Sequence, residues 1–232
     1  MGGKKVAILQ TNYIPWKGYF DLINSVDEFV LYDDMQYTKN DWRNRNKIKS
    51  PKGLHWLTIP VRQHSLSQKI RETQVADDSW GKKHWSTLKQ FYSKAPYFKT
   101  YQPLFEELYL NCTTPYLSEI NYRFISTINQ VLHIPTKLTW SSDYTLLEGK
   151  TERLIDLIQQ LDGKEYLSGP AAKDYIVPEL FEQAGIRLTW MDYSGYPQYD
   201  QIHPPFEHGV SILDLIFNAG EKASTLMKSF SK

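Results

Sequence analysis

Two adjacent carboxylates, Asp33 and Asp34, end a short apolar run and are followed by a segment of amides, aromatic residues and bases. Such a pair can bind a divalent cation that bridges phosphates, or one carboxylate can act as a general base. The structural alternative is that one carboxylate caps the turn and the other pairs with Arg43 or Arg45. Both interpretations stand, because neighbouring side chains at a strand end rarely face the same way.

The bases of this segment are concentrated. Residues 39–52 hold six bases and one carboxylate, whereas the whole chain has a net charge of only +1. In an extended segment the arginines share one face, while Asn44 and Asn46 share the other. The basic face suits a diphosphate, and the residues expected to bind it are Arg43, Arg45 and Lys47. A solvated basic loop and an RNA-binding patch are the alternatives, and the interleaved Trp42 favours a ligand site.

A second polar and aromatic stretch, residues 10–19, follows the first apolar run. It predicts a cradle in which Gly18 permits close backbone approach and the amino end of the following helix faces an anion; its members are Tyr13, Trp16, Lys17, Gly18 and Tyr19. The placement of this loop is similar to that of HxGH-type nucleotidyltransferases. Trp16 and Tyr19 stand where that motif has histidines, so the likeness is one of fold and not of adenylyl transfer.

Two histidines of the long loop at residues 192–209, His203 and His208, are candidates for a general acid or base, with an ordinary surface role as the alternative. His84, next to a tryptophan on an expected helix, is interpreted as structural. The chain contains no Walker loop, no GxSxG elbow and no HExxH pair, and its histidines lack metal-ligand spacing.

The elements that must position these residues begin with a compact βαβ unit. A strand at 5–10, a helix at 20–24 and a strand at 28–32 follow one another closely, and such crossovers join parallel strands. The loops at 10–19 and 33–47 should therefore leave the same sheet edge. We expect them to converge around one ligand.

The rest of the chain predicts a single α/β domain over residues 1–232, with a mixed or parallel sheet and a helical insertion at about 80–133. A strand is expected at 54–61, ended by proline, and a helix is expected after the Thr114-Pro115 cap. Later strands are expected at 135–140, 165–168 and 186–191, with helices at 151–161, 178–184 and 212–217. The strand at 165–168 opens onto Ser168 and Gly169, a further ligand edge.

Composition limits the functional class. A hydrophobic share of 41% is ample for a core, and a pI near 7.8 argues against a surface devoted to nucleic acid or anionic lipid. The single cysteine, Cys112, excludes an intrachain disulfide and a thiolate zinc cluster. No apolar run approaches membrane-spanning length, so a cytoplasmic protein is expected.

Several long motifs together resemble the WbqC-like protein family. They are residues 7–19 (AILQTNYIPWKGY), 32–37 (YDDMQY), 42–47 (WRNRNK), 56–61 (WLTIPV), 166–169 (YLSG) and 211–218 (SILDLIFN), and they span nearly the whole chain. Thr11 departs from the pattern, since proline or serine is common there. The resemblance implies a bacterial protein of surface-polysaccharide synthesis, often encoded with enzymes that make nucleotide-linked amino sugars for O-antigens.

The resemblance leads to one leading hypothesis, transfer of an aminoacyl group such as glycyl to the amine of a nucleotide-linked deoxyamino sugar. Asp33, Asp34 or His203 would act on the amine proton, and Trp16, Tyr19 and Trp42 would stack on the base or sugar. The residues expected to orient the ligand through hydrogen bonds are Gln10, Gln36, Tyr37, Asn44 and Asn46. Holding the amine and the activated ester in alignment would supply most of the rate enhancement.

The alternatives differ in class. One is a noncatalytic nucleotide-sugar binding protein of a biosynthetic complex, and another is an RNA binder. The sequence leaves open whether a divalent cation is needed, whether aminoacyl-tRNA is the donor, and which oligomer forms.

Overall fold

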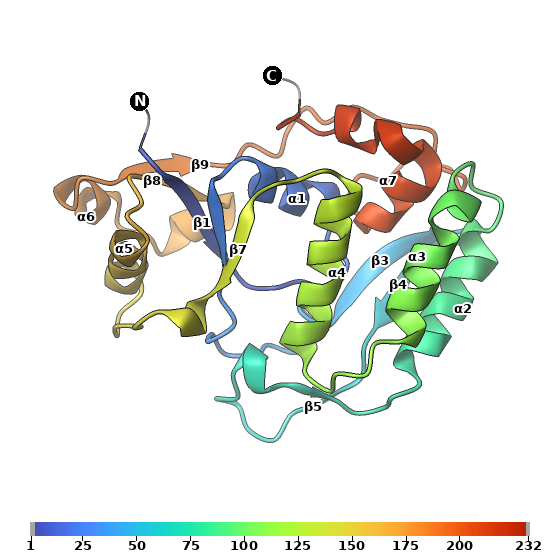
Figure 1. Ribbon diagram of the computed structural model, residues 1–232, viewed down its shortest axis with the longest axis horizontal. Coiled ribbons are helices and arrows are strands. Elements are labelled where there is room, and N and C mark those ends of the chain that lie inside the picture. Colours follow the sequence, from blue (N-terminus) through green and yellow to red (C-terminus); the bar gives the residue numbers. More distant parts are fainter. Residues whose placement is uncertain (1–2, 231–232) are drawn as a thin grey trace.

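The central feature of the fold is a five-stranded parallel sheet. The computed structural model describes residues 3–230. The strands of the sheet are β1 (Lys5–Leu9), β2 (Glu28–Leu31), β7 (Lys137–Trp140), β8 (Glu165–Ser168) and β9 (Arg187–Trp190). Their order is β7-β2-β1-β8-β9, so the chain winds first to one side of β1 and then to the other (Figure 1). This is a doubly wound order, and it confirms the predicted α/β class and the parallel βαβ start.

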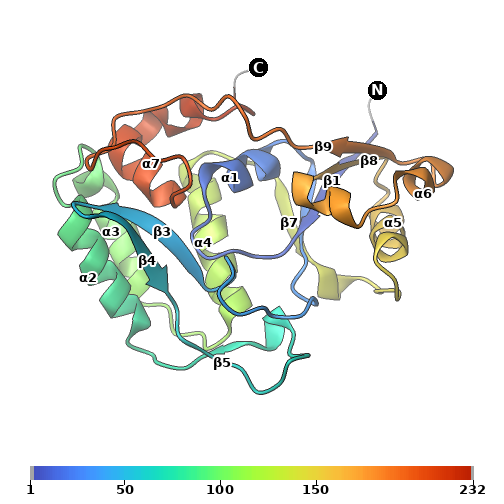
Figure 2. The same ribbon diagram turned by 180° about the vertical axis from the view of Figure 1, so that it is seen from behind.

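Helices cover both faces of this sheet because successive strand residues point to opposite sides. Ala7 and Phe29 belong to the larger apolar cluster, with α1 (Lys17–Asn24) and α4 (Leu117–Val131). Val6 and Val30 belong to a second cluster, with α5 (Thr151–Gln160) and α6 (Pro178–Gln183). Figures 1 and 2 show α5 and α6 at one end of the molecule and α2, α3 and α7 at the other.

The basic segment forms a strand of its own. β3 (Arg45–Ser50) pairs antiparallel with β4 (Gly53–Thr58), outside the main sheet. The strand expected at 54–61 therefore ends earlier, at Thr58, and belongs to this hairpin. Its turn is Pro51-Lys52, and Gly53, the first residue of β4, has a φ of 105°, which is readily adopted only by glycine. The alternation expected for an extended segment is confirmed, since Asn44, Asn46 and Ile48 are buried.

The helical insertion packs beside this hairpin. It consists of α2 (Trp80–Tyr92), α3 (Phe98–Leu110) and α4, and the short ladder of β5 (Val61–Arg62) and β6 (Gln74–Val75) precedes it. The predicted cap of α4 was wrong by two residues. The Pro115 carbonyl accepts a hydrogen bond from Val75 N and its Thr114 neighbour bonds Glu119, so the helix begins only at Leu117.

The last helix, α7 (Ile212–Ala219), lies against β3, α3 and the following 3-10 turn. Ser211 caps it as expected, accepting a hydrogen bond from Leu213 N at 3.3 Å. The segment after it is anchored by Asp21 of α1, which is fully buried and accepts hydrogen bonds from the backbone N–H groups of Lys228 (2.9 Å) and Ser229 (2.8 Å). None of the helices among residues 3–230 is both long and apolar enough to cross a membrane.

Candidate functional site

Three segments that are distant in sequence line a cavity of about 320 Å³. They are the loop after β1, the start of the β3–β4 hairpin and the end of the long loop before α7. The lining residues are Asn12, Pro15, Trp16, Trp42, Asn46, His208 and Gly209. We call it the tryptophan cavity. Its volume lies within the range of small-ligand sites.

Backbone hydrogen bonds hold the three segments together. Tyr13 N donates to Trp42 O at 3.0 Å, and Ile212 N donates to Pro15 O at 2.9 Å. Ser211 N donates to Lys47 O at 2.8 Å, which ties α7 to the hairpin. The loops at 10–19 and 33–47 therefore meet, as the βαβ geometry predicts, and the long loop at 192–209 completes the wall.

Gly18 is required by Trp16. A Cβ atom on Gly18 would lie 2.3 Å from the indole ring of Trp16, so only glycine lets this ring fold back over the start of α1. The ring also makes edge contacts with Tyr193 and Tyr196 at centroid distances of 5.1 and 5.8 Å. The close backbone approach that the sequence predicts at Gly18 thus serves a tryptophan of the cavity wall.

His208 gives the cavity its titratable group. Its Nδ1 is buried and has no hydrogen-bond partner within the described chain, and its ring makes an edge contact with Phe206. Burial lowers the pKa of His208, and the charge of Lys17 lowers it further against the opposing effect of Glu207. The imidazole is therefore neutral at pH 7 and able to accept a proton.

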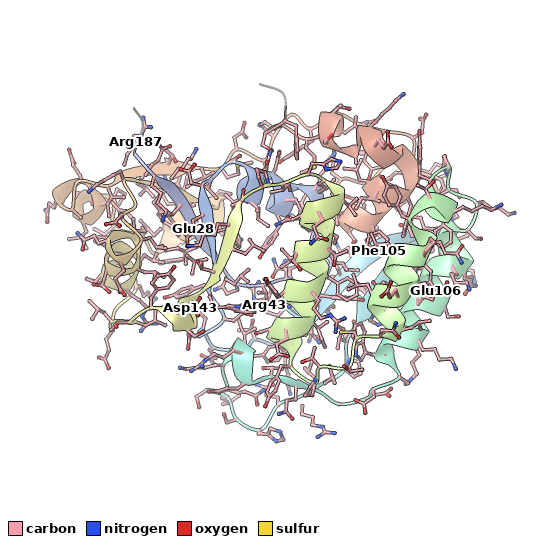
Figure 3. The ribbon with its side chains drawn as sticks, viewed as in Figure 1. Glu28, Arg43, Phe105, Glu106, Asp143 and Arg187 are labelled. Carbon is pink, nitrogen blue, oxygen red and sulfur yellow. The ribbon has the colours of Figure 1, made fainter. Side chains whose placement is uncertain are left out.

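Arg43 connects the cavity with the sheet edge. Its guanidinium donates to Asn12 Oδ1, which belongs to a lining residue, and lies 3.4 Å from Gln10 Oε1 at the end of β1. Asp41 is its ion-pair partner at 3.6 Å. Figure 3 shows Arg43 in the middle of the molecule, where α4 reaches it through a hydrogen bond from Asn121 to the Arg43 carbonyl. Arg43 holds the loop that bears the cavity.

Asp33 is placed as a structural carboxylate. It is 1% exposed and accepts hydrogen bonds from Thr11 N (2.8 Å), Thr11 Oγ1 (2.7 Å) and Ser118 Oγ. Burial raises its pKa, and these hydrogen bonds together with the charge of Arg43 oppose the rise. Its oxygens bond Thr11 and Ser118 of α4, and Asp33 is not among the residues that line the tryptophan cavity.

Asp34 turns to a different set of partners. It pairs with Arg71 Nε at 2.8 Å and Lys69 Nζ at 3.3 Å, and accepts a hydrogen bond from Ser141 at 2.9 Å. An arginine at residue 43 or 45 was expected as its partner, but Lys69 and Arg71, which follow the β3–β4 hairpin in sequence, take this place. The two carboxylates do not converge, and residues 3–230 contain no group of three His, Cys, Asp or Glu side chains placed to hold a metal ion.

Arg45 and Lys47 lie on the outer face of the hairpin, over tryptophan rings. The guanidinium carbon of Arg45 is 4.3 Å from the Trp56 ring centroid, and Lys47 Nζ is 5.2 Å from the same ring. Trp42 and Trp56 are 42% and 40% exposed, with ring centroids 5.6 Å apart. We call these four side chains the cationic face. Trp42 belongs both to this face and to the wall of the cavity.

Several other residues nominated from sequence form hydrogen bonds within the protein or are buried. Tyr13 is fully buried and bonds His84 and Tyr109, Tyr19 donates to Gln10 O, and Tyr37 is 2% exposed. Asn44 donates to Ile59 O, whereas Asn46 donates to Tyr13 O and Ile14 O and also lines the cavity. Lys17 is 3% exposed, donates to Pro197 O at 3.1 Å, and lies over the rings of Tyr196, Tyr199 and Phe206.

The remaining nominated residues lie outside the tryptophan cavity. His203 bonds Phe91 O at 2.8 Å, and Gln36 bonds Leu66 O at 2.5 Å. Ser168 is 4% exposed at the end of β8, and Gly169 lies near the hydroxyl of Tyr193. Sequence reasoning missed Trp56 on the cationic face, although its alternation with Leu54 in an expected strand was a usable signal.

The fold is a doubly wound α/β sheet with a cavity of about 320 Å³ beside the loop that follows β1. The chain belongs to the WbqC-like protein family, whose model matches residues 10–225. It is 50% identical over 226 residues to the uncharacterized protein Rv1507c of Mycobacterium tuberculosis, an alignment that covers 97% of this chain and 98% of the relative. No solved structure matches the chain.

Proposed function

We propose that the protein transfers an aminoacyl group to the amine of a nucleotide-linked amino sugar in bacterial surface-polysaccharide synthesis. The observation that carries this proposal is a cavity walled by Trp16 and Trp42 and supplied with an unpartnered, neutral His208. Aromatic faces suit the apolar face of a sugar, and polar neighbours such as Asn12 fix its orientation.

The chemistry needs a base and alignment. A sugar amine attacks the carbonyl carbon of an activated ester, a C–N bond forms, and the C–O bond to the carrier breaks. His208 accepts the amine proton and returns it to the departing oxygen of the carrier. Asp33 and Asp34, expected as candidate bases, are committed to Thr11 and to Arg71. His208 therefore takes the proton-transfer role in this proposal.

The cationic face supplies a nucleotide site beside the cavity. Arg45 and Lys47 present charges suited to a diphosphate, and the exposed rings of Trp42 and Trp56 suit a base. The Arg45 guanidinium donates to Asn40 Oδ1 at 3.3 Å and to the Asn40 carbonyl, and its buried Nε has no hydrogen-bond partner in the described part of the chain. Because Trp42 belongs to both surfaces, one ligand can place its nucleotide on the face and its sugar in the cavity.

The test is aminoacylation of nucleotide-linked amino sugars, followed by mass spectrometry for the mass of one aminoacyl group. Activated esters, with aminoacyl-tRNA among them, serve as donors. His208→Asn is expected to lower kcat by about 10²–10⁴-fold. His64→Asn changes an exposed histidine elsewhere and is expected to keep full activity.

The pH profile gives a second readout. The wild-type acidic limb of kcat/KM is expected below pH 6.5, because the pKa of His208 is lowered from that value. Retention of both activity and acidic limb in His208→Asn would remove His208 from the mechanism. If no sugar in the panel is aminoacylated although sugars bind, the protein is a binding module.

The cationic face also favours a second function, RNA binding. Two exposed tryptophans with two basic side chains over their rings resemble the stacking platforms of single-strand binders. In that case the affinity for tRNA should fall steeply with salt, and Trp56→Ala should weaken it at every salt concentration. A nucleotide-linked sugar that competes with tRNA would place both ligands on the same face.

A further inference from the structure

A second cavity, of about 240 Å³, lies where the two halves of the sheet diverge. It is lined by the end of β1, the residues that follow β2, one tyrosine of β8 and the beginning of α5, and it shares no lining residue with the tryptophan cavity. We call it the switch-point cavity, because the chain winds in opposite directions from β1 and β8. In doubly wound sheets the crevice outside these strand ends is where nucleotides bind.

The charge of this cavity is positive. Lys150 and Arg153 contribute to its lining, which contains no carboxylate within the described chain. Neither base forms an ion pair with a described carboxylate, unlike Arg71 or Arg187, which pair with Asp34 and Glu165. Arg153 donates through Nε to Leu147 O, and its Nη1 lies 3.7 Å from Met35 Sδ. The guanidinium thus retains N–H groups for an anion.

The residue types around Lys150 match the end of a phosphate-binding loop. After β7 the chain reads Gly149-Lys150-Thr151 at the start of α5, as the last three residues of a P-loop do. Gly149 has a φ of 94°, a value readily adopted only by glycine. Tyr144 stands where a P-loop has its first glycine, and the Thr151 hydroxyl accepts a hydrogen bond from Val177 N at 3.2 Å. The likeness is therefore limited to the glycine and the lysine.

Tyrosines complete the wall. Tyr32 directly follows β2, Tyr166 is the second residue of β8, and Tyr175 is a lining residue that is 48% exposed. Burial raises the pKa of Tyr32 although the adjacent Arg153 lowers it, so its hydroxyl stays protonated and can donate. The exposed ring of Tyr175 offers a flat face on which a base can stack.

We propose that the switch-point cavity binds the phosphate group of a nucleotide, with Arg153 and Lys150 on the phosphate oxygens and Tyr175 against the base. This site is additional to the cationic face and does not depend on aminoacyl transfer. The bound phosphate can belong to either of two molecules, the nucleotide-linked acceptor sugar or a separate nucleotide. Gln10 lines the switch-point cavity and Asn12 lines the tryptophan cavity. The Arg43 guanidinium contacts both of these side chains, so the two cavities are neighbours.

The test is isothermal titration of the full chain with inorganic phosphate, adenosine monophosphate and uridine diphosphate. Arg153→Ala is expected to weaken nucleotide binding roughly ten- to hundredfold, because it removes charged hydrogen bonds. Lys150→Ala removes a cavity lysine that forms no ion pair with a described carboxylate, and it is expected to weaken binding severalfold. Arg62→Ala removes an exposed arginine elsewhere and is expected to change nothing.

Further variants in the same titration distinguish nucleotide binding in this cavity from binding on the cationic face. If Arg45→Ala abolishes nucleotide binding while Arg153→Ala and Lys150→Ala leave it unchanged, the inference is overturned, as it is if none of the probes binds. His208→Asn is expected to keep the binding, so failure of aminoacyl transfer leaves this result standing. Displacement of the nucleotide by a nucleotide-linked sugar, one for one, identifies the acceptor as its source, whereas simultaneous binding identifies a separate nucleotide.

Discussion

Replacing Asp33 by alanine is expected to destabilise the protein and not merely to slow a reaction. The carboxylate is 1% exposed and accepts hydrogen bonds from Thr11 N, Thr11 Oγ1 and Ser118 Oγ, which join the loop after β1 to α4. In the variant these three donors lose their acceptor inside the protein. A buried donor left without a partner costs about 1–3 kcal/mol.

The net loss in the free energy of unfolding is smaller than the sum of the costs of these three donors. The variant no longer buries a carboxylate, and burial is the main cause of the raised pKa of Asp33. We therefore expect the free energy of unfolding to fall by about 3 kcal/mol, and a chain of this size loses about 2–4 °C of Tm for each kcal/mol. The expected fall in Tm is about 6–12 °C. Asp78→Ala, at an exposed aspartate, should stay within about 0.5 kcal/mol of the wild type.

The pH dependence follows from the raised pKa. Between the unfolded value near 3.8 and the higher folded value, the native state holds more protons than the unfolded state. The wild type therefore loses stability as pH rises through this window, and Asp33→Asn does not. Urea denaturation across the window measures the difference. An Asp33→Asn variant with wild-type stability at every pH but no turnover would refute the reasoning and return Asp33 to a catalytic role.

Two further predictions concern the cavity wall. Gly18→Ala is expected to displace the Trp16 ring, because the new Cβ would lie 2.3 Å from it, and to cost about 1–3 kcal/mol of stability; unchanged denaturation curves and unchanged tryptophan quenching would contradict this. Burial lowers the pKa of Lys17 from 10.5 to about 8, so the native state holds fewer protons than the unfolded state between these values. The wild type should gain stability relative to Lys17→Met as pH rises from about 8 to 10.5, and equal slopes in urea denaturation would show that Lys17 titrates normally.

The local patterns of the sequence predict the fold well. Apolar runs separated by an amphipathic segment predict β1, α1 and β2 with their parallel pairing, because an intervening helix carries the chain back to the end of the sheet from which it started. The convergence of the loops at 10–19 and 33–47 follows from the same pairing. What the pattern does not contain is the pairing of β3 with β4, because a strand rich in bases lacks the apolar alternation of a buried strand.

The site is less predictable, because residue type does not reveal the partner of a polar side chain. Asp33 and Asp34 are adjacent in sequence, yet they bond Thr11 and Arg71 from different segments. Likewise His203 and His208 are equivalent in a loop without secondary structure, and only the fold decides that the latter reaches the cavity. Long-range hydrogen bonds of this kind depend on tertiary packing, which local propensity does not encode.

The burial of Asp21 makes the far end of the chain a support of the tryptophan cavity. Asp21 bonds Tyr196 as well as Lys228 and Ser229, and Tyr196 contacts the ring of Trp16. A truncation before residue 228 would remove the donors of residues 228 and 229 from a buried carboxylate, leave Tyr196 as its remaining named donor, and weaken the support of the Trp16 ring. Deletions or fusions at this terminus are thus coupled to the pocket, and a shortened protein with weakened ligand binding need not have lost a residue that touches the ligand.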